Sequence, residues 1–210
     1  PLDIPVKVTN YDKDDKVVCL YTSNEEDQYS FVKKAKDRGY DVLNLAGPLM
    51  SHWLQKLETT FENITFTRVD SDSLDKLIKK SEDIPSKLSK EDEEKLKPVF
   101  EETLNKEKYM IQFESMSEDE APIIVTQPEF MRRMKEQQRM GGGGMYGAFP
   151  EMHHVVVNAN HPKVGALLEK KGDDQKVMVK QLTDLALLSQ GLLKGEALNN
   201  FIERNMEQIA

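Results

Sequence analysis

Short apolar runs alternate with amphipathic segments over the first third of the chain. Three of these runs have the composition of strands buried on both faces of a sheet, and they lie at residues 17–21, 41–46 and 64–69. Between the runs, residues 23–38 and 49–60 show patterns typical of helices. This order predicts a small three-layer α/β subdomain with a parallel sheet, which we place within residues 1–84.

Local signals mark the ends of the two expected helices. Ser23 and Glu26 have the spacing of a capping box, which predicts that the first helix begins there and runs to about Arg38. Gly39 suits the left-handed conformation that often follows a helix. The second helix is indicated by apolar residues at helical spacing, namely Leu49, Trp53, Leu54 and Leu57.

A highly charged stretch separates this subdomain from the rest of the chain. Residues 81–97 are dominated by Lys, Glu, Asp and Ser, which is typical of a solvated helix or a linker, and Pro98 is expected to open or kink the next helix. Further strand patterns lie at residues 109–113, 123–125 and 155–157. Thr126 and Glu129 form a second capping box, and His161 precedes another expected helix. These patterns predict an α+β domain over residues 85–210.

The last two expected helices, at about residues 173–190 and 196–208, are joined by a short connection and should pack as an antiparallel hairpin. Their apolar residues cover a wider arc than one domain face can bury. We therefore predict that two hairpins pair into an intersubunit four-helix bundle, which makes the second domain a dimerisation domain. The expected interface residues are Leu182, Leu185, Leu188, Leu198, Phe201, Ile202 and Met206. A monomer with both helices packed on its own sheet is the alternative.

Methionines gather in one stretch of the second domain, at positions 131, 134, 140, 145 and 152, and four glycines follow the first three at residues 141–144. Methionine is flexible and polarizable, and surfaces that accept many apolar partners are rich in it. Arg132, Arg133 and Lys135 flank a narrow apolar stripe on the expected helix. We interpret this stretch as a mobile, partly exposed apolar segment, and a loosely specified core patch is the alternative.

The overall charge and composition exclude several classes of function. The net charge of −8 and the sequence pI near 5.2 disfavour a nucleic-acid partner. No apolar run approaches the length of a membrane span, so no membrane partner is expected. The single cysteine, Cys19, excludes a disulfide framework and suits a cytoplasmic location. Because the sequence begins at Pro1 and has no leader, we expect a soluble fragment of a longer protein.

Candidate catalytic arrangements are scarce, and we predict no catalytic, cofactor-binding or metal-binding residues. The first strand-to-helix turn, residues 22–27, lacks glycine and carries three consecutive carboxylates, which would repel a phosphate. His153, His154 and His161 lack a Cys or a carboxylate at metal-ligand spacing. The four-glycine run follows a helix and lacks the ending of a phosphate loop. A small α/β nucleotide-binding regulator or enzyme is kept as the alternative function.

The order of several short motifs resembles the heat-shock protein 90 chaperone family over residues 12–210. One of them is Asn158-Ala159-Asn160-His161-Pro162, and the others lie at residues 17–23, 39–45, 121–126, 185–188 and 199–206. The resemblance implies the end of the family's middle segment followed by its C-terminal dimerisation domain, and a bacterial type of protein. It also implies a fragment that is not itself an enzyme, since the ATP and Mg site of the parent ATPase would lie upstream of Pro1.

The resemblance also implies partners and contact surfaces. The expected partners are a second copy of the chain and non-native client proteins, bound in support of protein folding. One client-contact patch would consist of His52, Trp53 and Lys56, although His52 and Lys56 depart from the acidic and amide residues of the family pattern. The other would lie in the methionine-bearing segment and comprise Met131, Met134, Met140, Met145, Tyr146 and Phe149.

Overall fold

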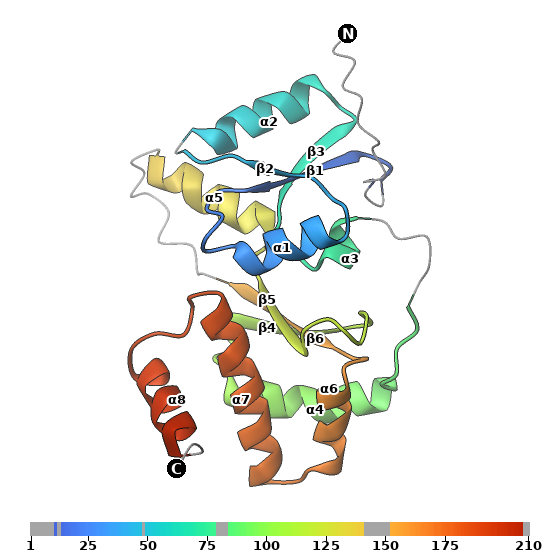
Figure 1. Cartoon of the computed structure of the whole chain (residues 1–210), viewed down its shortest axis with the longest axis vertical. Helices are drawn as coiled ribbons and strands as arrows, with labels where there is room; N and C mark the ends of the chain where they lie inside the picture. The colour runs from blue at the N-terminus through green and yellow to red at the C-terminus, as the bar shows by residue number, and fades with distance from the viewer. Residues whose placement is uncertain (1–10, 12–13, 48, 79–83, 141–151, 208–210) are drawn as a thin grey trace. The chain divides into compact units, whose positions relative to one another are not determined.

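A computed structural model describes residues 11, 14–47, 49–78, 84–140 and 152–207, and for residues 136–140 it describes the backbone only. The chain divides into two compact units. The first unit consists of Pro1–Glu82 and Pro128–Gly147, and the second consists of Asp83–Gln127 and Ala148–Ala210. Figure 1 shows the elements of both units along the chain.

The first unit contains the predicted parallel sheet. Strands β1 (Val17–Thr22), β2 (Val42–Asn44) and β3 (Ile64–Arg68) lie in the order β2-β1-β3, and both neighbouring pairs are parallel. Because the chain moves from β1 to β2 in one direction and then crosses back to β3, right-handed crossovers place their two helices on opposite faces of the sheet. Figure 1 shows this arrangement, and the predicted α/β class of this unit is confirmed.

Helices α1 (Tyr29–Asp37), α2 (Met50–Thr60) and α3 (Leu74–Leu77) flank this sheet. The predicted start of α1 at Ser23 is wrong, because the helix begins at Tyr29. The side chain of Gln28 bonds to the turn before the helix, where the sequence predicted a cap by Ser23. Its Oε1 accepts from the backbone N–H groups of Ser23 and Asn24 at 2.9 and 3.2 Å. The predicted end at Gly39 is confirmed by its φ of 80°. The core of the unit is formed by Val18, Leu20, Tyr21, Phe31, Val32, Ala35, Leu54 and Val69.

The second unit is built on another sheet of mixed direction. Strands β4 (Tyr109–Glu114), β5 (Ile123–Thr126) and β6 (His153–Asn158) lie in the order β4-β6-β5. Strand β6 is parallel to β4 and antiparallel to β5. The sheet is accompanied by four α-helices and one short 3-10 helix in the described part of this unit. The α-helices are α4 (Lys90–Thr103), α6 (Pro162–Gly165), α7 (Asp173–Ser189) and α8 (Gly195–Glu207), and the 3-10 helix is η1 (Ala166–Glu169).

The core of the second unit lies between its sheet and helices α4 and α7. Leu96 and Phe100 of α4 are buried with Val155 and Val157 of β6 and Val179 of α7. An edge-to-face contact also joins the rings of Phe100 and Phe113, whose centroids are 6.0 Å apart. This mixture of helices with a mixed sheet confirms the predicted α+β class of the unit. The four-helix bundle between subunits stays a prediction.

Two helix starts in this half of the chain differ from those that the sequence predicts. Helix α4 begins after Ser89, whose Oγ accepts from the N–H of Asp92 at 3.2 Å, and Pro98 lies inside the helix rather than opening it. Thr126 is the last residue of β5 and does not cap α5 (Glu129–Met140). The predicted start at His161 is confirmed, because its Nδ1 accepts from the N–H of Lys163 at 3.0 Å.

Helix α5 belongs to the first compact unit, although it follows β5 of the second unit in sequence. Its residues lie within the range that we assigned to the second domain. The helix is strongly amphipathic, but the most buried of its described side chains belongs to a cation, Arg132, which is only 5% exposed. A buried guanidinium requires partners for its donors. These partners are Glu129, three residues earlier on the same helix, and Tyr21, which is far away in the sequence.

Candidate functional site

The C-terminal helices pack against each other through polar side chains. Arg204 of α8 donates to the carboxylate of Asp184 on α7 at 2.7 Å, and Gln181 donates to Oδ1 of Asn205 at 2.9 Å. Gln181 of α7 pairs with Asn205 of α8, whereas the later residue Asp184 pairs with the earlier residue Arg204, so the two helices run antiparallel. This confirms the hairpin itself, which Figure 1 shows as α7 and α8.

The predicted dimer-interface residues fall into two groups. Leu182 and Phe201 are buried in the core of the second unit and Leu198 is partly buried against that core, so these residues hold the hairpin in place. Four other residues keep large exposed fractions: Leu185 47%, Leu188 40%, Ile202 49% and Met206 62%. These four residues, called here the hairpin face, are the apolar surface that a second subunit could cover.

The structure adds one residue that the sequence interpretation missed. Val177 on α7 is 56% exposed. It precedes Leu188 by three helical turns, which brings the two positions to within about 20° on the helix surface. The helical spacing from Leu188 was therefore a signal that could have found it.

The first predicted client-contact patch lies on the outer side of α2. Trp53 is 63% exposed, and His52 and Lys56 beside it are also exposed. The next residue, Leu54, points into the core and is 1% exposed. Leu49, one turn before Trp53, is 55% exposed, so it belongs to this surface rather than to the core face that its spacing indicated.

The second predicted patch is only partly described. Met131 and Met134 of α5 are partly buried, and their neighbour Phe130 is 70% exposed. Met140 ends α5, and nothing is described of its side chain. Met145, Tyr146 and Phe149 lie outside the described residues. The predicted mobile segment begins at Met131 within α5, and its residues 141–151 likewise lie outside the described residues.

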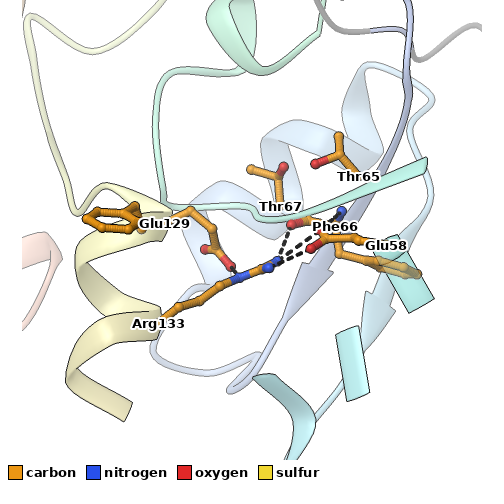
Figure 2. A pocket seen from close by; sticks show the side chains of 7 residues that line it. Glu58, Thr65, Phe66, Thr67, Glu129 and Arg133 are labelled. Carbon is orange, nitrogen blue, oxygen red and sulfur yellow. Dashed lines mark hydrogen bonds and ion pairs between the residues drawn. The ribbon is translucent and has the colours of Figure 1, made fainter. Parts of the chain in front are cut away.

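Helix α5 is held on the first unit by a network of charged and phenolic groups. The hydroxyl of Tyr21 on β1 donates to Glu129 Oε1 at 2.8 Å, and Arg132 donates to both of these groups. The next residue, Arg133, donates to Glu58 of α2 at 2.7 and 3.1 Å and to the carbonyl of Phe66 on β3 at 2.7 Å. Figure 2 shows this second cluster.

Burial and charge pairing shift the pKa values of this network. Burial alone would raise the pKa of Glu129, but hydrogen bonds from Arg132, Arg133 and Tyr21 hold it below its ordinary value. Burial, and then the nearby Glu129 carboxylate, raise the pKa of Tyr21 well above its usual range. Burial would lower the pKa of Arg133, whereas hydrogen bonds to Glu58 and Glu129 raise it. At neutral pH the carboxyl group of Glu129 is therefore ionised, Arg133 is a cation and Tyr21 is a neutral phenol.

The turn after β1 offers little to a nucleotide phosphate. The N–H groups of Ser23 and Asn24 donate to Gln28 Oε1, and those of Glu26 and Asp27 donate to Asn24 Oδ1. Phosphate-binding loops need such N–H groups to face the ligand. These contacts argue against the nucleotide-binding alternative. Among the described residues, no group of three or more His, Cys, Asp or Glu side chains is placed to hold a metal ion.

No helix in the described part of the chain is both long and apolar enough to span a membrane.

Comparison with known proteins gives one consistent result. The family model described as "Hsp90 protein" matches residues 8–209. The chaperone protein HtpG of Bacteroides thetaiotaomicron is 30% identical over 97% of this chain, and that of Porphyromonas gingivalis is 32% identical over 92%. This chain spans 40% and 38% of the lengths of these two relatives.

Proposed function

This chain belongs to the Hsp90 protein family, and we propose that it is a C-terminal segment that dimerises the chaperone and presents apolar surface to non-native client proteins. The observation that carries the proposal is the pair of exposed apolar surfaces, one on the hairpin face and one around Trp53. Soluble proteins seldom expose such patches without a partner.

Dimerisation is the role that we assign to the hairpin face. Leu185 and Leu188 lie on α7, and Ile202 and Met206 lie on α8, so each subunit would contribute both helices. An isologous pairing of two identical surfaces buries both at once and closes the assembly as a dimer. The polar contacts of Arg204 and Gln181 support this role. They satisfy the hydrogen-bonding groups between α7 and α8, and the apolar residues of the hairpin face remain on the outer surface.

Client binding is the role that we assign to the surface around Trp53 and to the methionine-bearing helix α5. A broad, weak binder needs apolar side chains that adapt to many partners, and the flexible, polarizable side chain of methionine suits this role. Trp53 and Leu49 are already exposed on α2. Met131 and Met134 are partly covered, so they would contribute in full only after α5 moves.

The energy-consuming step belongs, in this proposal, to the parent protein. The chain would neither bind nor hydrolyse ATP, and the ATP and Mg site would lie elsewhere in a cytoplasmic chaperone. The coupling is mechanical, because a C-terminal dimer contact holds two parent chains at a high effective concentration. Closure of the two arms then becomes an intramolecular event.

The proposal is tested by light scattering across a dilution series, with and without a thermally denatured model client. We expect the mass of a dimer at all but the lowest concentrations, and a reduced rate of client aggregation. A monomer at every concentration would refute the dimerisation role. A stable dimer that leaves client aggregation unchanged would refute the client-binding role and would leave a structural adaptor as the explanation.

A further inference from the structure

Within the described part of the chain, side chains rather than another strand bond to the outer edge of β3 at Phe66. In the order β2-β1-β3, β3 is an edge strand of the first sheet. The N–H of Phe66 donates to Glu58 Oε1 at 2.7 Å, and its carbonyl accepts from Arg133 at 2.7 Å. Unpaired edge groups of this kind otherwise invite an added strand. Glu58 and Arg133 therefore take the place of a missing neighbour.

Glu58 and the Phe66 carbonyl together form a receptor for a guanidinium group. Arg133 makes two bonds to the carboxylate and one to the carbonyl, and its side chain and that of Glu58 are 17% and 21% exposed. The planar fork of arginine suits this arrangement of acceptors, whereas a lysine ammonium is a single point charge. The acceptors come from α2 and β3, while the arginine comes from α5.

A hollow of about 300 Å³ opens beside this receptor (Figure 2). It is lined by Glu58, Thr65, Phe66, Thr67, Glu129, Phe130 and Arg133. Threonines of a strand and two aromatic residues next to a carboxylate suit an extended segment with one cation and apolar neighbours. Phe130 is 70% exposed, so one wall of the hollow is accessible from solvent.

We propose that Glu58, Phe66 and this hollow form a binding site for an extended peptide segment that carries an arginine, and that Arg133 occupies the site in cis. The inference rests on the proposed function, since non-native clients would supply such segments. An arriving arginine displaces Arg133 from Glu58 and from the Phe66 carbonyl, and the residues that flank this arginine enter the hollow. Displacement also loosens α5 and uncovers Met131 and Met134, so polar and apolar client contacts are coupled.

Occupation in cis lowers the apparent affinity of the site. A ligand that binds only when Arg133 is away has its affinity reduced by the fraction of molecules in that state. Removing the arginine side chain removes this competitor but keeps Glu58 and the strand edge. The inference therefore predicts that removing the Arg133 side chain tightens the binding of an arginine peptide. Loss of a positive charge acts in the same direction, so the charge-conserving variant Arg133→Lys separates the two causes.

The test uses a fluorescent heptapeptide of alternating valine and threonine around a central arginine, and a second peptide with glutamine at the centre. Fluorescence anisotropy should give an affinity for Arg133→Ala that is roughly tenfold tighter than for the wild-type chain, which corresponds to about 1.4 kcal/mol. The double variant Glu58→Gln/Arg133→Ala should lose that gain. The glutamine peptide should bind all variants equally weakly.

Controls separate this site from general effects of charge and folding. Glu102→Gln removes an exposed carboxylate paired with Lys176 in the second unit and should leave peptide binding unchanged. Circular dichroism shows whether Arg133→Ala still folds and keeps α5. If it does not, Arg133→Lys replaces it, because lysine keeps the charge and the helix propensity but lacks the planar fork of arginine. This variant should still bind the arginine peptide more tightly than wild type does.

The inference is overturned if neither arginine variant binds the peptide more tightly than wild type, or if the double variant keeps the full gain. Client aggregation assays on the same proteins keep this result distinct from the proposed function. Suppressed aggregation by a wild-type chain whose variants show no peptide effect would refute the site and leave the chaperone role intact. Failure of the wild-type chain to affect any client would refute the proposed function itself.

Discussion

Arg204 of α8 donates from Nη2 to Oδ2 of Asp184 on α7 at 2.7 Å, and Asp184 is completely buried. Lys180 also donates to this carboxylate from one turn away. A buried carboxylate needs such partners, because its desolvation is otherwise costly. Arg204 further lies over the ring of Phe201, 5.8 Å from its centroid. One arginine thus joins the two helices of the hairpin to the core.

Replacing Arg204 with Ala is expected to destabilise the second unit by about 2 kcal/mol, since hydrogen bonds to charged groups contribute roughly 1.5–3 kcal/mol. Lys180 still pairs with Asp184 in this variant, which keeps the loss below that of an unpaired buried charge. Urea unfolding followed by circular dichroism measures the change. Lys176→Ala, which breaks an exposed pair between α7 and Glu102 of α4, serves as the control and should leave the midpoint unchanged.

Leu185→Asp and Ile202→Asp are each expected to convert the dimer into monomers. Both side chains are about half exposed in the subunit, so Asp should be tolerated in the monomer but costly in an apolar interface. Sedimentation velocity gives the mass, and thermal unfolding verifies the fold. Tyr29→Asp, at a 63% exposed aromatic position on α1, is the matched control and should remain dimeric. An unchanged mass for both hairpin variants would place the interface elsewhere.

Adjacent residues of α2 should give opposite results when truncated. Trp53→Ala removes an exposed ring, so it should weaken suppression of client aggregation at nearly unchanged stability. Leu54→Ala removes a side chain that is 1% exposed, and the cavity should cost about 2–5 kcal/mol of unfolding free energy. Aggregation kinetics and urea unfolding on both variants provide the comparison. Equal losses of stability would mean that Trp53 is a packing residue.

Tyr21→Phe tests how α5 is anchored. The Tyr21 hydroxyl donates to Glu129 and accepts from Arg132, so in the variant each of these two partners loses one hydrogen bond. We expect a loss of about 1–3 kcal/mol and faster amide exchange in α5. Hydrogen exchange read by mass spectrometry measures the second effect. Exchange in α4, which lies in the other unit, should not change and serves as the internal control.

The elements with strong local patterns were predictable from the sequence. Three apolar runs placed β1, β2 and β3, and the order of helices between them fixed a parallel sheet. Helix starts were less predictable, because capping residues have competing partners. The backbone N–H groups of the turn after β1 donate to Gln28, where Ser23 was expected to cap a helix. Thr126 is the last residue of a strand and caps no helix. Local spacing cannot reveal which of two partners a side chain finds in the folded chain.

The contacts of α5 could not be predicted, because they join residues far apart in the sequence. The sequence showed Arg132 and Arg133 only as cations that flank the apolar stripe of Met131 and Met134, whereas Arg132 is buried against Tyr21. Tyr21 and Arg132 are separated by 111 positions. A charge on an amphipathic helix normally faces water. Its burial here depends on the phenol of Tyr21, which only the folded chain brings within reach, together with the carboxylate of Glu129 three residues earlier on the same helix.

The contacts of Glu129 also make the first unit sensitive to acid. The ordinary pKa of this carboxyl group is 4.5, and hydrogen bonds from Arg132, Arg133 and Tyr21 lower the pKa against the opposing effect of burial. Because the folded-state pKa lies below the unfolded value, the group adds stability above about pH 4.5, and this contribution is lost as the pH falls through the folded-state pKa. Glu58, which shares Arg133, faces the same cluster from α2.

Other carboxylates with lowered pKa values, among them Asp92 and Glu102 of α4, also weaken the chain in acid, so a single pH profile does not isolate Glu129. The informative quantity is the difference in unfolding midpoint between wild type and Glu129→Gln, measured between about pH 6 and about pH 3. The wild type should be the more stable protein at the upper end, and the difference should shrink below about pH 4.5 because protonation removes the same charge that the substitution removes. Parallel curves across this range would show that Glu129 is not held ionised by its arginines.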